Sequence, residues 1–412
     1  MTPQIPHAAV SSASYREARW PQAALLLFGS CLSVLAAVLI APLLPSMQRE
    51  FSNTAGATVL VPLLIALPAL MVALVAPFAG MIADRVARKP LLLGSLLLYS
   101  LFGLMPLWLD SLYLIVASRA GIGLAEAGIM TCCTTLIGDY YSGVRRQRLL
   151  AMQMVATSLS AVVIITLSGF LGSESWRTPF ALYAVGLVLL PLMAWLLWEP
   201  RREDHSAARP VASLFPWKAM LPLYALTLLG GISLLVVPAQ AGYLLGLLGV
   251  EAPQLIGMTM GANQIAVVAG ALSFRVLVRY RLDWLLLAAF ALTGAGALLM
   301  AVASSHPAMV VAVVVNGLGI GLMLPTLITW IMGQVAADLR GRATGGFTSA
   351  MFAGNFLSPL AILAITGGVL LALPKAIAVI GVIQLLIALA CLGVPRLGGL
   401  EVRVEAAPGN AH

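Results

Sequence analysis

The sequence predicts an all-α membrane protein in which twelve transmembrane helices form two pseudo-symmetric six-helix bundles. Three observations support this fold class. Hydrophobic residues make up 61% of the chain and charged residues 9%, whereas soluble domains carry about 25% charged residues. Apolar stretches long enough to cross a bilayer, about 20 residues each, recur along the whole chain. One long polar break, EPRREDHSAARPVASLFPWK at 199–218, divides these stretches six and six.

The apolar stretches give the order of elements along the chain. The N-terminal 20 residues are polar and lack the short apolar core of a cleaved signal peptide. The sequence is therefore divided into a tail (1–20), a first bundle (21–199), a central loop (200–218), a second bundle (219–395) and a C-terminal tail (396–412). The predicted spans are 21–45, 57–80, 91–109, 112–138, 150–172, 179–198, 219–245, 254–274, 284–303, 308–333, 345–367 and 376–394.

The basic residues predict the orientation in the membrane. The net charge of +8 would also suit a nucleic-acid-binding protein, but its distribution indicates a positive-inside bias instead. If the N-terminus is placed inside, 19 of the 23 basic residues fall in inner segments and three in outer loops. We therefore expect both termini to be cytoplasmic and no nucleic-acid partner. The halves also repeat weakly, because a shift of 194 residues places Arg85 on Arg279 and Arg146 on Arg340.

Side-chain amides indicate which helices avoid lipid, because an unpaired amide in hydrocarbon is costly. Predicted spans 3, 6 and 9 contain no Asn or Gln, which suggests that every third helix is peripheral. Span 12, with Gln384, departs from the pattern, and span 2 has no amide. Repeat-built transporters place the substrate site between the repeats near the midplane. The candidate polar residues of such a cavity are Gln153, Gln240, Asn263, Gln264, Asn316 and Asn355.

The loop between predicted spans 2 and 3 reads GMIADRVARKP at 80–90. It resembles the Gly-x-x-x-Asp-Arg-x-Gly-Arg-(Arg/Lys) signature of the major facilitator superfamily, with Ala87 in place of the second glycine. The resemblance covers 21–395. It implies two bundles that rock about a central cavity lined by spans 1, 4, 7 and 10. The matching positions are Gly80, Asp84, Arg85, Arg88 and Lys89.

This motif predicts a cytoplasmic gate. The Asp84 carboxylate can meet the positive end of the helix that starts near 340, together with nearby guanidinium groups such as Arg340. The stretch ADLRGRATGG at 337–346 resembles the partner of the motif in the second half. An alternative reading is that Arg85, Arg88 and Lys89 only set the orientation. Acidic residues contribute little to orientation, so Asp84 favours the gate.

Predicted span 4 contains SRAGIGLAEAG at 118–128, with Arg119 and Glu126 seven residues apart. They lie within roughly 20° of the same helix face and about 10.5 Å apart along the axis. A charge at the bilayer centre costs at least about 2.5–3.5 kcal/mol, which favours a functional role. Glu126 would bind a proton or a cationic substrate group. Arg119 would hold an anionic group or set the protonation of Glu126. A fixed ion pair that braces the bundle is the structural alternative.

Family resemblances refine this interpretation without fixing the direction of transport. RAGIGLAEA resembles the span 4 motif of proton antiporters, in which the arginine, here Arg119, serves proton coupling. The run also resembles that of Spinster-like lipid transporters. RGRATGGFTSAMFAGNFLSP at 340–359 is similar to span 11 of bacterial efflux-type members, which implies a bacterial inner membrane. Span 5, however, lacks the Gly-Pro motif of drug–proton antiporters, so the direction of transport stays open.

Other chemistry is not indicated. The sequence has no Walker-type loop, and its four histidines fall in tails or loops. GLGIGL at 317–322 indicates close helix packing, and the four cysteines are apolar packing residues. We expect no metal, no cofactor and no enzymatic activity.

The sequence therefore predicts a monomeric secondary transporter that exports a small organic solute or drug in exchange for protons. A proton-coupled importer of an organic acid or other nutrient is the alternative, with Arg119 as the anion anchor. A membrane sensor that does not transport is a remote third possibility.

Overall fold

The computed structural model describes residues 18–85, 87–200, 215–279, 281–336 and 339–393, and side chains are described outside 79–85 and 392–393. In this part of the chain, twelve helical segments are long and apolar enough to cross a membrane, which confirms the predicted fold class. The first six comprise α1 (Trp20–Val38), η1 (Ala41–Leu43), α2 (Leu44–Glu50), α3 (Ala57–Arg85), α4 (Arg88–Leu104), η2 (Met105–Leu107), α5 (Leu112–Tyr140), α6 (Gly143–Leu171), η3 (Thr178–Ala184) and α7 (Val185–Leu196).

The second six segments run from the central loop to the end of the described chain. They comprise α8 (Trp217–Leu247), α9 (Pro253–Leu277), α10 (Leu282–Val302), α11 (His306–Gly333), α12 (Arg340–Thr366), η5 (Leu370–Ala372) and α13 (Leu373–Gly393). Several of these helices continue through internal prolines, as transmembrane helices can when neighbouring groups satisfy the freed backbone.

The first span is broken near its far end. Helix α1 stops at Val38, and the chain continues through η1 and α2 to Glu50. Pro42 and Pro45 lie at the starts of η1 and α2, and they lack the N–H groups that would continue the α-helical ladder. This break leaves carbonyl groups at the end of α1 without helical partners. One of them becomes part of the site described below.

The two halves pack with matching contacts. In the first half α1 contacts α5 and α6, α3 contacts α5, and α4 contacts α5 and α7. In the second half α8 contacts α11 and α12, α9 contacts α11, and α10 contacts α11 and α13. Helices α4, α7, α10 and α13, the third span of each set of three, pack within their own half. This agrees with the absence of amides from three of them.

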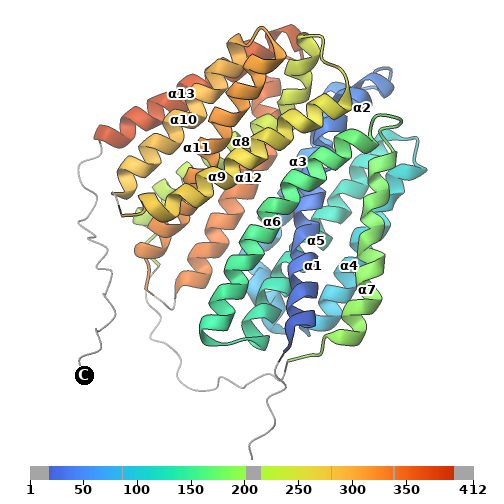
Figure 1. Cartoon of the computed structure of the whole chain (residues 1–412), viewed down its shortest axis with the longest axis vertical. Helices are drawn as coiled ribbons and strands as arrows, with labels where there is room; N and C mark the ends of the chain where they lie inside the picture. The colour runs from blue at the N-terminus through green and yellow to red at the C-terminus, as the bar shows by residue number, and fades with distance from the viewer. Residues whose placement is uncertain (1–17, 86, 201–214, 280, 337–338, 394–412) are drawn as a thin grey trace, which may run out of the picture.

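The halves meet along two equivalent helix pairs, α3 with α12 and α6 with α9. Figure 1 shows α6 and α9 running side by side between the two bundles. Glycine permits this approach: a Cβ atom on Gly169 would lie 2.5 Å from the Pro253 carbonyl oxygen and 2.9 Å from the Gly257 Cα. We call the end of the molecule with Arg88, Arg145 and Arg340 the basic face, and the opposite end, with Arg49 and Lys375, the distal face.

Candidate functional site

Helix α5 carries a buried stripe that faces α1. Arg119, Glu126 and Cys133 recur every seven residues, so they share one side of the helix. Their exposed fractions are 0%, 3% and 0%. Cys133 shows that the stripe faces α1, because its Sγ atom lies 2.9 Å from the position that a Cβ atom on Gly29 of α1 would occupy. The sequence periodicity therefore placed Arg119 and Glu126 on the same face.

Each nitrogen of the Arg119 guanidinium donates one hydrogen bond to an acceptor from another element. Its Nε donates to the Leu64 carbonyl oxygen of α3 at 3.1 Å. One Nη donates to the Tyr183 hydroxyl of η3 at 2.8 Å, and the other to the Ala36 carbonyl oxygen of α1 at 2.8 Å. Arg119 thus ties α5 to α1, α3 and η3. Its hydrogen bonds are to neutral groups, and it makes no ion pair with Glu126.

Two of these acceptors are available because the local helices are interrupted. The carbonyl of Leu64 would normally bond to the N–H of residue 68, but that residue is Pro68. Ala36 belongs to the last turn of α1, where carbonyl groups lack helical partners. A charged donor is well suited to such carbonyls, since bonds to ionised groups are stronger than neutral ones. Pro68 and the end of α1 therefore provide two of the carbonyl acceptors that Arg119 binds.

Two tyrosines complete this buried cluster, and the sequence reasoning missed both. The Tyr183 ring lies 5.7 Å from the Arg119 Cζ and 5.1 Å from the Tyr99 ring, centre to centre. The Tyr99 hydroxyl donates to the Leu32 carbonyl oxygen of α1. Tyrosines inside apolar spans could have served as a signal, because a buried hydroxyl requires a partner.

Glu126 sits at the middle of α5 without such partners. Its side chain is 3% exposed, and no residue in the described ranges donates a hydrogen bond to its carboxyl group or pairs with it. The Arg119 charge, one heptad away, is already engaged by carbonyl and hydroxyl oxygens. An isolated buried carboxylate is expensive. Glu126 is therefore a group that can take up a proton, a water molecule or a cationic ligand group.

The six predicted cavity amides divide into two groups. Asn263 and Asn316 are buried and donate to backbone carbonyls of Val313 and Thr293, so they join helices of the second half. Gln153 joins α6 to Ser30 of α1 at 2.6 Å and to Thr134 of α5 at 3.1 Å. The remaining three are not engaged in this way.

Gln240, Gln264 and Asn355 have open hydrogen-bonding capacity. The Asn355 Oδ1 atom is buried without a partner, and neither Gln240 nor Gln264 has a hydrogen-bond partner in the described part of the chain. Gln384, the amide that departed from the peripheral pattern, donates to Ser233 of α8 and so faces its own bundle.

At the basic face, the predicted gate residues take part in a network within the first half. Arg88 pairs with Asp139 at the end of α5. The Glu199 carboxylate accepts from the backbone N–H groups of Arg88 and Lys89, both at 2.8 Å, and thereby caps the start of α4. The Lys89 Nζ donates to the Ala194 carbonyl oxygen at 2.7 Å. Asp139 and Glu199 are thus further functional candidates.

The remaining predicted gate residues are Gly80, Asp84, Arg85 and Arg340. Gly80, Asp84 and Arg85 lie outside the residues whose side chains are described. Arg340 is exposed at the first position of α12. One turn beyond it, Gly345 approaches the Ala76 carbonyl oxygen and Pro77 of α3. The end of α3 that carries the motif therefore runs beside the start of α12.

A cross-half hydrogen bond near this point uses another carbonyl freed by proline. The Ser349 hydroxyl of α12 donates to the Ala73 carbonyl oxygen of α3 at 2.6 Å. The helical partner of Ala73 would be the N–H of residue 77, which is Pro77. Prolines of α3 thus supply acceptors both to Arg119 and to the opposite half.

The halves also meet at the distal face. Arg49 of α2 pairs with Glu251, which precedes α9, at 3.0 Å. Pro45 lies against Gly242 of α8, and its Cγ atom is 2.9 Å from where a Cβ on that glycine would be. These contacts join η1 and α2 to α8 and α9 and close the distal face.

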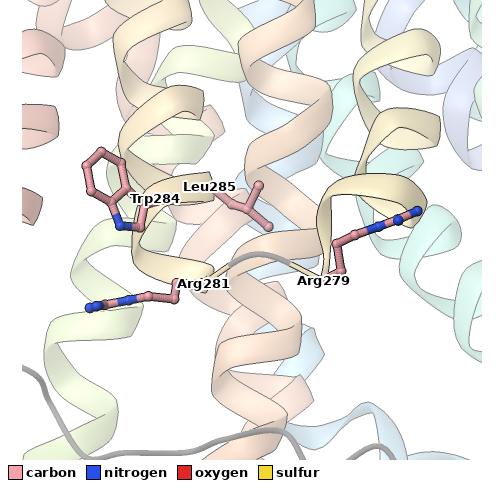
Figure 2. A pocket seen from close by; sticks show the side chains of 4 residues that line it. All are labelled: Arg279, Arg281, Trp284 and Leu285. Atoms are coloured by element: carbon pink, nitrogen blue, oxygen red, sulfur yellow. The ribbon is translucent and has the colours of Figure 1, made fainter.

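A shallow recess of about 540 Å³ lies at the basic end of the second half, between α9 and α10. Arg279, Arg281, Trp284 and Leu285 line it. Figure 2 shows that the two guanidinium groups point in opposite directions. Arg281 is also bound by Asp283, at 2.5 Å. The recess therefore does not offer two converging cations to a ligand.

Comparisons with known proteins agree with this architecture. Residues 26–359 match the family model for the Major Facilitator Superfamily. Tetracycline resistance protein, class C, of Escherichia coli is 32% identical over 199 residues, which are 45% of this chain and 48% of that protein. Multidrug resistance protein 1 of Bacillus subtilis is 24% identical over 352 residues, 82% and 87% of the two chains. The chain spans about half the length of the tetracycline resistance protein that it matches.

Two further comparisons concern another transporter and a solved structure. The gallate transporter of Pseudomonas putida is 29% identical over 144 residues, 33% of this chain and 31% of that one. The crystal structure of a bacterial homolog of the human lysosomal transporter Spinster, in an inward-facing and occupied conformation, has a TM-score of 0.72 and 16% identity. It covers 90% of this chain and 95% of its own. The chain therefore belongs to the Major Facilitator Superfamily.

Proposed function

We propose that the protein exports a small organic solute in exchange for protons, by alternating rocking of its two halves. The observation that carries this proposal is Glu126, a buried carboxyl group at the middle of α5 with no partner in the described structure. A carboxyl group that is buried in one state and hydrated in another can bind and release a proton during the cycle. Helix α5 packs against α1, α3, α4 and α6 of the first half in the present arrangement, so the proposal requires that rocking expose Glu126 to water.

Arg119 has a different role in this mechanism. Its three hydrogen bonds tie α5, the helix that carries Glu126, to α1, α3 and η3, and they hold a positive charge one heptad away from Glu126. It is therefore a positioning residue for the proton site. The substrate contacts are assigned to two groups with unused hydrogen-bonding capacity, Gln264 and Asn355, and to Gln153 between α1 and α6.

Alternating access requires that each face close in turn. The distal contacts, including the pair between Arg49 and Glu251, close that face in the present arrangement. For the opposite arrangement we assign the latch to Asp84, directed at the start of α12, with Arg88, Lys89 and Arg340 close by. The proximity of Gly345 to Pro77 supports this assignment, because Asp84 lies two turns further along α3. We place the basic face in the cytoplasm of a bacterial cell.

The names of two relatives support export as the direction of transport, and a transport experiment tests it. The names of two relatives refer to drug resistance, which export confers. The gallate transporter favours the second candidate, import of an organic acid.

Purified protein in proteoliposomes with an acidic interior decides between the two candidates. Proton efflux should drive tetracycline inward, above the level in protein-free liposomes. The proposal fails if tetracycline does not exceed that level, and gallate leaving together with protons would establish import chemistry.

A further inference from the structure

A second cavity lies between the two halves at the distal face, away from Glu126. Its volume is about 440 Å³, within the range of sites that hold small organic molecules. The first half contributes Pro45 and Pro62, and the second half contributes Gln240, Tyr243 and Ile362. The proposed proton site plays no part in this cavity, because Glu126 is on α5 and no residue of α5 lines it.

The cavity depends on the closed distal face. The ion pair between Arg49 and Glu251 lies on its wall, and both residues line it from opposite halves. Gly242, which also lines the cavity, lies against Pro45. Rocking that separates α2 from α8 would therefore divide the cavity. Any molecule that contacts both sides stabilises the closed distal face, because ligands favour the state that binds them better.

Its lining combines apolar walls with polar groups that lack partners. Eight of the 19 lining residues are proline, isoleucine or leucine. The Tyr243 hydroxyl is buried with no hydrogen-bond partner, and the Gln240 amide, 5% exposed, has none in the described part of the chain. A buried polar group without a partner is costly, so each favours a ligand that supplies a donor or acceptor.

We propose that this distal cavity binds a small, uncharged, amphipathic molecule whose hydrogen-bonding head meets Gln240 and Tyr243, and that its occupancy holds the distal face closed. The ligand is uncharged, since Arg49 and Glu251 already neutralise each other across the cavity. Such a molecule reaches the transporter from the distal side. It inhibits the cycle without competing at the proton site.

Photolabelling with 4-hydroxybenzophenone tests the proposal independently of transport. This neutral probe has a hydroxyl and a ketone group and inserts into nearby C–H bonds when irradiated. Protein in lipid nanodiscs is labelled, digested and mapped by mass spectrometry. We expect labels concentrated on 359–373 and 240–247. Leu363→Trp, which fills the cavity, should reduce them at least tenfold, and Gln240→Leu should reduce them severalfold.

The control is Leu386→Trp, an equal change at a side chain that is 59% exposed on α13, and it should leave the labelling pattern unchanged. If gel filtration shows that Leu363→Trp does not fold, the labelling of Gln240→Leu is compared with that of the control, and this comparison tests the proposal. Labels spread evenly over the lipid-facing helices, or labelling that neither variant reduces, would overturn the proposal. Neither result would affect the proposed proton exchange, because the readout does not depend on transport.

Discussion

Replacing Arg119 with methionine should destabilise the first half of the transporter. Methionine keeps much of the aliphatic length but removes the guanidinium. The Leu64 carbonyl, the Ala36 carbonyl and the Tyr183 hydroxyl then lose their donor together. Neither carbonyl has an alternative helical partner, because Pro68 lacks an N–H and α1 ends at Val38. The change therefore releases the contacts that tie α5 to three neighbouring elements.

The magnitude follows from the number of bonds. Interhelical hydrogen bonds in membrane proteins contribute about 0.6 kcal/mol on average and about 1.7 kcal/mol at most. Three such bonds give a loss in unfolding free energy between about 2 and 5 kcal/mol for Arg119→Met. Tyr183→Phe removes only one acceptor, so its loss should be about one third as large. The ratio between the two variants is a stricter test than either value.

Reversible unfolding in mixed detergent micelles, followed by circular dichroism, measures both free energies. The control is Arg49→Met, because Arg49 is exposed and makes an ion pair with Glu251 and a hydrogen bond to Ser46. Exposed ion pairs contribute about 0–1 kcal/mol. If Arg119→Met unfolds at the same denaturant fraction as the parent, the bracing role of Arg119 is wrong. A Tyr183→Phe loss as large as that of Arg119→Met would equally contradict the reasoning.

Three further outcomes follow from the contacts. Glu199→Gln should weaken the cap of α4 and lower thermal stability by a few degrees in a fluorescence melt, and an unchanged melting temperature would count against the cap. Gly169→Leu should wedge α6 away from Gly257 and reduce tetracycline transport at least tenfold with normal expression, since no room exists for a side chain there; normal transport would contradict the close approach. Pro45→Cys with Gly242→Cys should form a disulfide that stops transport until it is reduced, because the two residues touch across the distal face; transport that continues with the disulfide formed would show that this face need not open.

The sequence was sufficient for the architecture because each span is a local property. Length and hydropathy identify a helix, and the heptad spacing of Arg119 and Glu126 follows from helical geometry alone. The polar break divided the chain in two. The early end of α1 was the main local departure, and Pro42 and Pro45 explain it.

The partners within the site depend on contacts between distant segments, which no local pattern encodes. The acceptors of Arg119 come from α1, α3 and η3, up to 83 residues away. An ion pair between Arg119 and Glu126 was one of the alternatives, and the structure instead gives Arg119 carbonyl and hydroxyl partners. Helix packing also decides that Asn263 and Asn316 bond to neighbouring backbone. Composition alone cannot separate such amides from Asn355, which remains unpaired.

The role of Glu126 is the central claim, and Glu126→Gln tests it most directly, because glutamine keeps the shape and cannot ionise. Proteoliposomes with this variant, with the parent and with Glu174→Gln, an exposed control, are compared in two assays. One is tetracycline counterflow without a pH gradient, and the other is accumulation driven by a pH gradient. Glu126→Gln should retain counterflow within about threefold of the parent and lose driven accumulation. Accumulation equal to that of the parent would contradict proton coupling at Glu126, and loss of both activities would assign this carboxyl group to the substrate.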